Sequence, residues 1–412
     1  MSQQGPILII SDRPNPPAAK ALADAKVFPV VDTDWSGAAE AVRRMQPAAI
    51  VVATYEGSPE SLDALATQVD AIQPLVPLIA LDPKLPLPPN ILPFTQTTGG
   101  STRIAARLNA ALRARLLHAT VLRRLTDEKT ASVRLPDNDP LLDATVLLLG
   151  RGASFPALSI ALGEQTAVVG ALSIEAAAKH LNSREFDGIV IGEGFSPRVV
   201  DAFLMVLSED SRFRNLPVVL AQIGGLAKDY DLPNLEIANE LPQDLAASAL
   251  PLIRLHAFES RLHRVLKSID VGGLLDPRTG LLTEHAFHRD FAHAVQETLM
   301  RGAGLAVAKF SFTAIQERSR FDAARILSRL MRRMDFATLC DDGSIIAVFA
   351  ETDLRTAQMI ARRLTSVMKQ TVMGRKRDQR LDPDVAVTTL QPQDTVDALL
   401  ARLNDERERA AS

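Results

Sequence analysis

Residues 332–349 read RRMDFATLCDDGSIIAVF, with two short apolar runs on either side of an Asp-Asp-Gly-Ser turn. Asp-Gly between two strand-like runs is a strong signal for a tight β-hairpin, which we predict over Phe336 to Phe349. A basic–acidic couple, Arg332 and Asp335, stands directly before the first strand. The stretch therefore predicts a hairpin that follows a helix, with these two charges at the junction.

The sequence on both sides extends this hairpin into one α+β unit. Thr283 is a good N-cap for a helix whose apolar face carries Phe287, Phe291 and Val295. Around the hairpin we expect a strand at Leu305 to Phe312, a helix at Phe321 to Met334, a helix at Leu354 to Met368, a strand at Val385 to Thr389 and a helix at Val396 to Arg409. This element order is typical of a ferredoxin-like palm.

Two earlier units alternate buried strands with helices. We predict strands at Ile7 to Ile10, Val27 to Val31, Ala49 to Val52 and Leu78 to Leu81, and again at Val146 to Leu149, Ala167 to Val169, Gly188 to Ile191 and Pro217 to Ala221. Such alternation predicts doubly wound parallel sheets of the flavodoxin-like class, covered on both faces. Each unit ends in a long helix, at Thr102 to about Thr130 and Pro242 to about Ile269. We therefore predict three domains, 1–135, 141–270 and 271–412, with a proline-bounded linker between the first two.

Composition restricts the class of protein. Of the 412 residues, 47% are hydrophobic and 23% charged, which is typical of a globular chain. The net charge of -3 provides no basic footprint for nucleic acid. A single cysteine, Cys340, fits a reducing compartment. The N-terminus does not read as a signal peptide, and no apolar run is long enough to insert in a membrane. We expect a cytoplasmic protein.

The first two units resemble the receiver (REC) domains of response regulators. Receivers hold a divalent cation with an acid pair after their first strand and accept phosphate on an aspartate after their third. In the first unit Asp12 is the one retained acid of the pair, but the acceptor position falls on Ala53. In the second unit the pair reads Gly150-Arg151 and the acceptor position falls on Gly192. The resemblance therefore implies no phospho-acceptor in either unit.

The third unit resembles GGDEF domains, which make cyclic di-GMP at the hairpin. Asp276, Thr279, Gly280, Leu281 and Phe287 match the segment with which these domains begin. The metal-binding acids of the family are replaced by 309–311, Lys-Phe-Ser, and the Gly-Gly-(Asp/Glu)-Glu-Phe hairpin by 341–345, Asp-Asp-Gly-Ser-Ile. A cyclase needs these acids and glycines to hold metal and nucleotide. By this resemblance we expect a degenerate domain that is not an enzyme, with no catalytic residue, no metal and no cofactor.

A second site of the family is retained. GGDEF domains bind cyclic di-GMP at an inhibitory site (I-site) of Arg-x-x-Asp before the hairpin, with a further arginine on the helix after it. The matching residues are Arg332, Asp335 and Arg363. The tetrapeptide pattern alone is weak evidence, because it also starts at Arg124, Arg134, Arg184, Arg198, Arg375 and Arg402. The position before the hairpin makes the Arg332 instance informative.

The residue types suit this ligand, which carries two phosphates and two guanines. A guanidinium can bind a phosphate or the guanine O6/N7 edge through two parallel hydrogen bonds. The carboxylate of Asp335 could accept from the guanine N1–H and N2–H groups, and Arg363 would form the opposite wall. An alternative is that these charges are solvated remnants of a decayed domain.

The whole chain resembles the REC–REC–GGDEF cell-cycle regulators of the PleD and PopA group. That resemblance implies a non-catalytic cyclic di-GMP receptor at the cell pole, whose protein partners are an adaptor of the ClpXP protease and its substrate, and a homodimer through the receiver-like domains. The alternative is a ligand-independent dimeric scaffold. Residual GTP binding that activates a partner enzyme is a third hypothesis, disfavoured by the lost glycines and acids.

Overall fold

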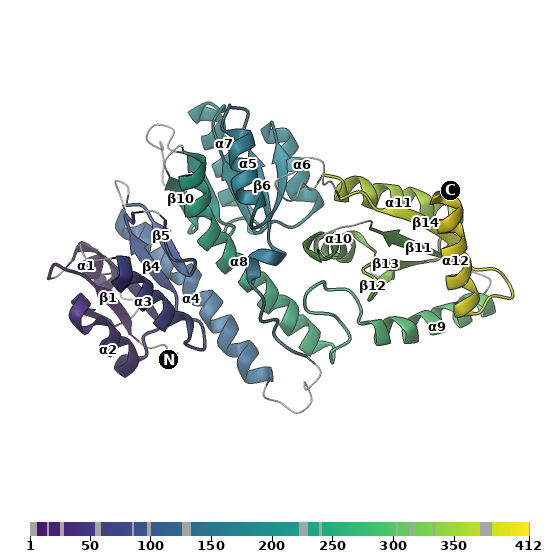
Figure 1. The fold of residues 1–412 in the computed structure, drawn as a ribbon, viewed down its shortest axis with the longest axis horizontal. Helices are drawn as coiled ribbons and strands as arrows, with labels where there is room; N and C mark the ends of the chain where they lie inside the picture. The colour runs from purple at the N-terminus through teal and green to yellow at the C-terminus, as the bar shows by residue number, and fades with distance from the viewer. Residues whose placement is uncertain are drawn as a thin grey trace.

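The computed structural model contains three sheets, arranged in a row from the N-terminal to the C-terminal part of the chain (Figure 1). We call the parts that carry them the first receiver-like unit, the second receiver-like unit and the palm. None of the described helices is both long and apolar enough to cross a membrane. The structure describes residues 6–14, 16–24, 29–53, 59–84, 86–96, 100–125, 133–221, 230–238, 241–301, 304–312, 317–332, 334–370 and 381–411.

The first receiver-like unit is a five-stranded parallel sheet in the order β2-β1-β3-β4-β5. Helices α1 and α4 pack on one face of this sheet, and α2 and α3 on the other. The elements are β1 (Ile7–Ile10), α1 (Pro17–Asp24), β2 (Val30–Thr33), α2 (Trp35–Met45), β3 (Ala49–Val52), α3 (Pro59–Asp70), β4 (Leu78–Leu81), β5 (Ile91–Phe94) and α4 (Gly100–Leu125).

The second receiver-like unit repeats this topology, with the order β7-β6-β8-β9-β10. Helices α5 and α8 pack on one face and α6 and α7 on the other. The elements are η2 (Pro140–Asp143), β6 (Thr145–Leu149), α5 (Phe155–Gly163), β7 (Ala167–Ala171), α6 (Ile174–Ser183), β8 (Gly188–Ile191), α7 (Pro197–Glu209), β9 (Val218–Ala221), β10 (Leu235–Ala238) and α8 (Pro242–Asp270).

The palm has a four-stranded antiparallel sheet in the order β12-β13-β11-β14. Helices α10 and α11 cover one face of this sheet, and α9 and α12 the other. The elements are α9 (Glu284–Arg301), β11 (Leu305–Ser311), α10 (Glu317–Leu330), β12 (Phe336–Leu339), β13 (Ile345–Ala350), α11 (Leu354–Met368), β14 (Asp384–Thr389) and α12 (Val396–Ala411). The strand–helix–strand–strand–helix–strand order is the predicted ferredoxin-like one.

The predicted fold class is confirmed, but some elements were predicted wrongly. Strand β2 begins at Val30 rather than Val27, and residues 27–28 lie outside the described part. Strands β5 and β10 were not predicted at all. Each is the edge strand of its sheet, and an edge tolerates Pro93 in β5 because one side of the strand needs no donor. The predicted helix to Met334 ends at Leu330 instead. The domain boundaries remain predictions.

The two receiver-like units pack on each other through their last strands and last helices. Arg107 of α4 is fully buried there and donates to Glu236 of β10 at 3.1 Å, and to the carbonyls of Pro93, Pro233 and Leu235. The same carboxylate accepts from the backbone N–H of Thr95 at 2.7 Å. The predicted homodimer through receiver-like domains therefore cannot use these faces, since they are already covered within one chain.

A buried ion pair joins the second receiver-like unit to the palm. Arg184, which follows α6, donates to both carboxylate oxygens of Asp322 on α10 at 2.5 Å, and both side chains are almost fully buried. Thr145 of β6 donates to the same carboxylate at 3.0 Å, and Arg325 of α10 donates to the carbonyl of Asp143. Burial alone would raise the pKa of Asp322, but Arg184, Arg325 and Thr145 outweigh it and lower the pKa.

We predict that Asp322→Asn lowers the free energy of unfolding by about 3–5 kcal/mol at pH 7, because the buried Arg184 loses its counter-charge. Since the pKa of Asp322 lies below its ordinary 3.8, the wild-type contribution is present at neutral pH and is lost as the pH falls below that value. Urea denaturation at several pH values should show the free energies of unfolding of the wild type and the variant becoming equal in acid. Glu40→Gln, which removes an exposed pair with Arg43, is the control and should change little. An equal deficit at pH 7 and pH 3 would contradict the prediction.

Candidate functional site

Arg332 and Asp335 lie together in the turn between α10 and β12. The backbone N–H of Asp335 donates to the carbonyl of Arg332 at 3.0 Å, and the N–H of Arg332 donates to Asp335 Oδ2 at 3.2 Å. Asp335 Oδ1 accepts from the N–H of Ala350, at the end of β13, at 3.3 Å. The carboxylate therefore closes the turn and ties it to the far strand of the hairpin. This capture of the Arg332 N–H is why α10 stops before the predicted Met334.

Asp335 is largely buried, with 9% of the residue exposed. Burial raises its pKa, while the two backbone N–H groups and the charge of Arg332 oppose the rise. The charge of Asp335 and the geometry of the turn are therefore coupled, because the donors that hold the turn also stabilise the ionised carboxylate.

The two arginines of the predicted site are both exposed. Arg332 is exposed beside the turn, and Arg363 is exposed on α11, whose buried residues are Ala357, Ala361, Leu364 and Met368. Helices α10 and α11 pack on the same face of the palm sheet. In the described part of the chain, neither guanidinium makes a hydrogen bond or ion pair. The structure thus brings Arg332 and Asp335 together and places Arg363 on the neighbouring helix.

Strand β11 carries a buried lysine, at a position where the sequence resemblance led us to expect a metal-binding acid, and the chain itself neutralises it. Lys309 of β11 is buried, and its Nζ lies 3.4 Å from Asp342 Oδ2 in the hairpin turn. It also donates to Asn404 Oδ1 of α12 at 3.1 Å. Burial would raise the pKa of Asp342, but hydrogen bonds from Ser344 and the charge of Lys309 lower it. The charge of the buried lysine is therefore balanced by a side chain of the hairpin turn.

A second cation lies against the hairpin turn. Gly343 has a φ of +77°, and a Cβ placed on it would collide with the guanidinium of Arg320 from α10. The turn therefore needs glycine for its backbone conformation, and the space above that glycine is filled by an arginine of the same chain. Lys309 and Arg320 therefore both lie against the hairpin turn.

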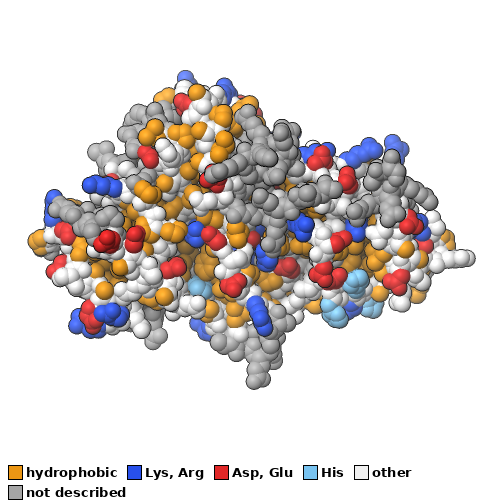
Figure 2. Space-filling model, in the orientation of Figure 1, with side chains coloured by type: hydrophobic (Ala, Val, Ile, Leu, Met, Phe, Trp, Pro, Cys, Tyr) orange, Lys and Arg blue, Asp and Glu red, His pale blue; other side chains and the backbone are white. Residues whose placement is uncertain are grey.

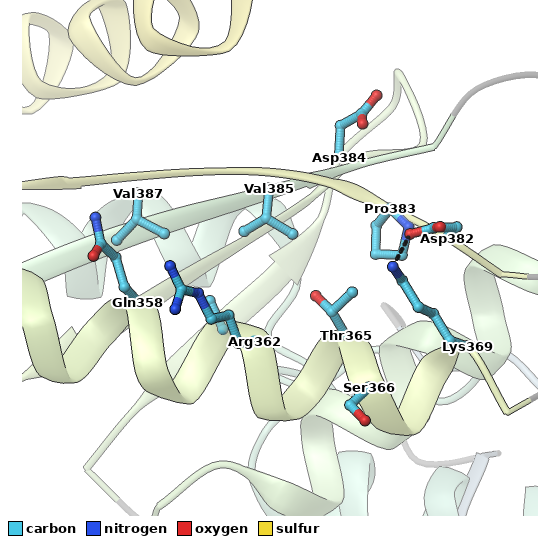
Figure 3. Close-up of a pocket in the computed structure, with 11 residues that line it drawn as sticks. Gln358, Arg362, Thr365, Ser366, Lys369, Asp382, Pro383, Asp384, Val385 and Val387 are labelled. Carbon is cyan, nitrogen blue, oxygen red and sulfur yellow. Dashed lines mark ion pairs between the residues drawn. The ribbon is translucent and has the colours of Figure 1, made fainter. Parts of the chain in front are cut away.

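A cleft that sequence reasoning missed lies between α11 and β14. Its volume is about 690 Å³, and Figure 3 shows Arg362 reaching from α11 toward β14, next to Val385 and Val387. Lys369 pairs with Asp382 at its far end, at 2.9 Å. Arg362 is exposed and lines this cleft, whereas its neighbour Arg363 does not. The available signal was the spacing of Gln358, Arg362, Thr365 and Lys369, which puts them on one helix face.

No protein-family model and no curated protein matches the chain. Similar solved structures cover about a third of it. The coiled coil and GGDEF domain of DgcB from Caulobacter crescentus, in complex with c-di-GMP, is 13% identical, with 37% of this chain and 87% of that one covered and a TM-score of 0.31. A sensory box/GGDEF family protein from Caulobacter crescentus CB15 is 21% identical, covering 34% and 97% at a TM-score of 0.29. The FimX GGDEF domain from Pseudomonas aeruginosa is 18% identical, covering 34% and 93% at a TM-score of 0.29. At these identities and scores, no conclusion about ligand or activity follows from the likeness.

We predict that Asp335→Ala lowers the free energy of unfolding by about 1–3 kcal/mol, because the backbone N–H groups of Arg332 and Ala350 lose their acceptor. Asp341→Ala is the matched control, since Asp341 is an exposed aspartate six residues further along the same hairpin. Chemical denaturation of both variants measures the difference. Equal stability of the two variants would show that Asp335 does not hold the turn.

Proposed function

We propose that this chain is a non-catalytic receptor for cyclic di-GMP, which binds at Arg332, Asp335 and Arg363 and controls the docking of protein partners. The observation that carries the proposal is the anchored turn. The carboxylate of Asp335 accepts from the backbone N–H groups of Arg332 and of Ala350 in β13, while the Arg332 side chain stays exposed. A cation held in place and left accessible is preorganised for an anionic ligand, which reduces the entropy lost on binding.

The ligand chemistry fits the three residues. Two exposed guanidinium groups can each take a phosphate or a guanine O6/N7 edge through paired hydrogen bonds. The backbone N–H groups of Arg332 and Ala350 use one lone pair on each oxygen of Asp335. An ionised carboxylate has about four such lone-pair sites. Asp335 can therefore hold the turn and still accept from the guanine N1–H and N2–H groups.

The proposal that the palm is not a cyclase is supported by the two cations at the hairpin. Lys309 stands where the GGDEF resemblance expects a metal-binding acid and is paired with Asp342, and Arg320 lies against Gly343 of the hairpin turn. Magnesium sites in such enzymes are built from carboxylates. A lysine ammonium has no lone pair and cannot replace a carboxylate as a ligand of the metal ions that the synthesis of cyclic di-GMP requires.

Helix α10 gives ligand binding a route to the rest of the chain. Its C-terminal end leads into the Arg332 turn, and its earlier part carries Asp322 and Arg325, which contact the second receiver-like unit. A ligand that prefers one placement of α10 therefore favours one arrangement of the palm against that unit. A few kcal/mol of preference is enough to shift such an equilibrium.

The proposed output follows the resemblance to the REC–REC–GGDEF regulators of the PleD and PopA group. In this proposal the liganded chain acts at the cell pole, where it delivers a cell-cycle regulator to the ClpXP protease through an adaptor. The second candidate is a ligand-independent dimeric scaffold. Its dimer contact would have to use faces other than β5, α4, β10 and α8, which are packed within the chain.

Isothermal titration calorimetry of the full chain with cyclic di-GMP tests the receptor proposal. We expect binding in the micromolar range or tighter, weakened about tenfold or more in Arg332→Ala and in Arg363→Ala, since a hydrogen-bonded charge contributes about 1.5–3 kcal/mol. Arg362→Ala is the matched control: it removes the same charge one residue away and should leave binding unchanged. GTP should give no heat and no cyclic di-GMP.

The outcomes separate the alternatives. Loss of binding in Arg362→Ala with normal binding in Arg363→Ala would place the ligand in the cleft between α11 and β14 instead. No heat at high ligand concentration would leave the scaffold as the surviving candidate. Product formed from GTP would overturn the non-catalytic part.

A further inference from the structure

A groove of about 780 Å³ lies between α6 and α7 on the second receiver-like unit, away from the palm residues discussed above. Its lining includes an apolar series on each helix, Ile174, Ala178 and Leu181 from α6 and Val199, Ala202, Phe203, Val206 and Leu207 from α7. The spacing of three and four residues places each series on one face of its helix. Figure 2 shows hydrophobic side chains gathered over this unit.

The receiver topology itself does not require this apolar surface. Val206 is 61% exposed and Val199 is 40% exposed on α7, and Leu172, just before α6, is 62% exposed. In the first receiver-like unit, the equivalent helices are α2 and α3. Among their described residues no large hydrophobic side chain is exposed. The comparison shows that this face can be built without exposed large hydrophobic side chains, so the fold does not account for those on the second unit.

Charge is distributed unevenly along the groove. Helices α6 and α7 both follow strands of a parallel sheet, so their N-terminal ends and partial positive charges lie at the same end. Arg151 and Arg198 line that end, accompanied by one acid, Glu175. At the other end Arg212 is already paired with Asp210 at 2.7 Å. The first end is therefore net positive and the second is locally balanced.

The dimensions fit one helix. The groove follows α7 from Val199 to Asp210, which at 1.5 Å per residue is a length of about 16 Å, or three helical turns. We propose that this groove docks an amphipathic helix of a partner protein, with an apolar stripe of about three turns and acidic residues at the end that meets Arg151 and Arg198. Such a helix buries its stripe on α6 and α7 by the helix-in-groove mode.

A designed peptide tests the surface on the full-length chain without cyclic di-GMP. The probe is a fluorescein-labelled helix with leucines at i, i+4, i+7 and i+11 flanked by glutamates, and its twin has lysines in place of the glutamates. By fluorescence anisotropy we expect the acidic peptide to bind about tenfold or more tightly than the lysine twin. Val206→Glu should abolish that binding, whereas Met205→Glu, at the next residue of α7 and outside the groove lining, should not.

Arg198→Glu should weaken binding of the acidic peptide and strengthen binding of the lysine twin. Equal binding of the two peptides, or binding that survives Val206→Glu, would overturn the proposal. Sedimentation velocity tests whether a second copy of the chain fills the groove instead. A dimer that is lost in Val206→Glu but kept in Met205→Glu would show this and overturn the proposal. No groove residue lies in the palm. Failure of the peptide to bind would therefore leave the receptor proposal standing, and failure of cyclic di-GMP to bind would leave the docking proposal standing.

Discussion

The arrangement of the chain around the palm depends on the buried contact between Arg184 and Asp322. Two charges removed from water carry a large desolvation cost, which only close geometry and additional hydrogen bonds can offset. Both conditions hold, since the guanidinium reaches both carboxylate oxygens and Thr145 donates to the same group. Such a pair tolerates little displacement. It therefore fixes α10 against the second receiver-like unit, and with α10 it fixes the starting point of the turn that presents Arg332.

The contact between the receiver-like units follows the same principle and determines which of their surfaces remain exposed. The fully buried Arg107 is satisfied by Glu236 and by backbone carbonyls of both units. This packing uses the last strand and last helix of each unit, so those elements are unavailable to other chains. The α6–α7 face of the second unit lies on the opposite side of its sheet from α8 and stays open. Internal packing thus covers one face of the sheet in the second unit and leaves the other exposed.

Periodic patterns predicted most of the fold, because buried parallel strands and amphipathic helices leave a strong signal in local sequence. The prediction failed where a distant group decides the local structure. Strand β10 contains Glu236, which reads as a polar loop residue until its partner Arg107, 129 residues away, is known. The end of α10 depends on the carboxylate of Asp335 and, through it, on Ala350. The place of Lys309 in the first palm strand could be predicted by aligning that strand with the GGDEF pattern. Its contact with Asn404 on the last helix could not.

The two ends of the palm hairpin differ in how their cations are used, and this difference supports a receptor over an enzyme. At the turn, Lys309 and Arg320 are held inside the domain, where Asp342 and Asn404 satisfy the lysine. At the start of the hairpin, the carboxylate of Asp335 accepts from two backbone N–H groups, so it fixes the backbone of Arg332 while the Arg332 side chain stays exposed. An exposed arginine needs no internal partner because water solvates it, and a phosphate can replace that water at little structural cost. The cations at the turn are thus held by groups of the domain itself, whereas the arginine at the start of the hairpin is exposed to solvent.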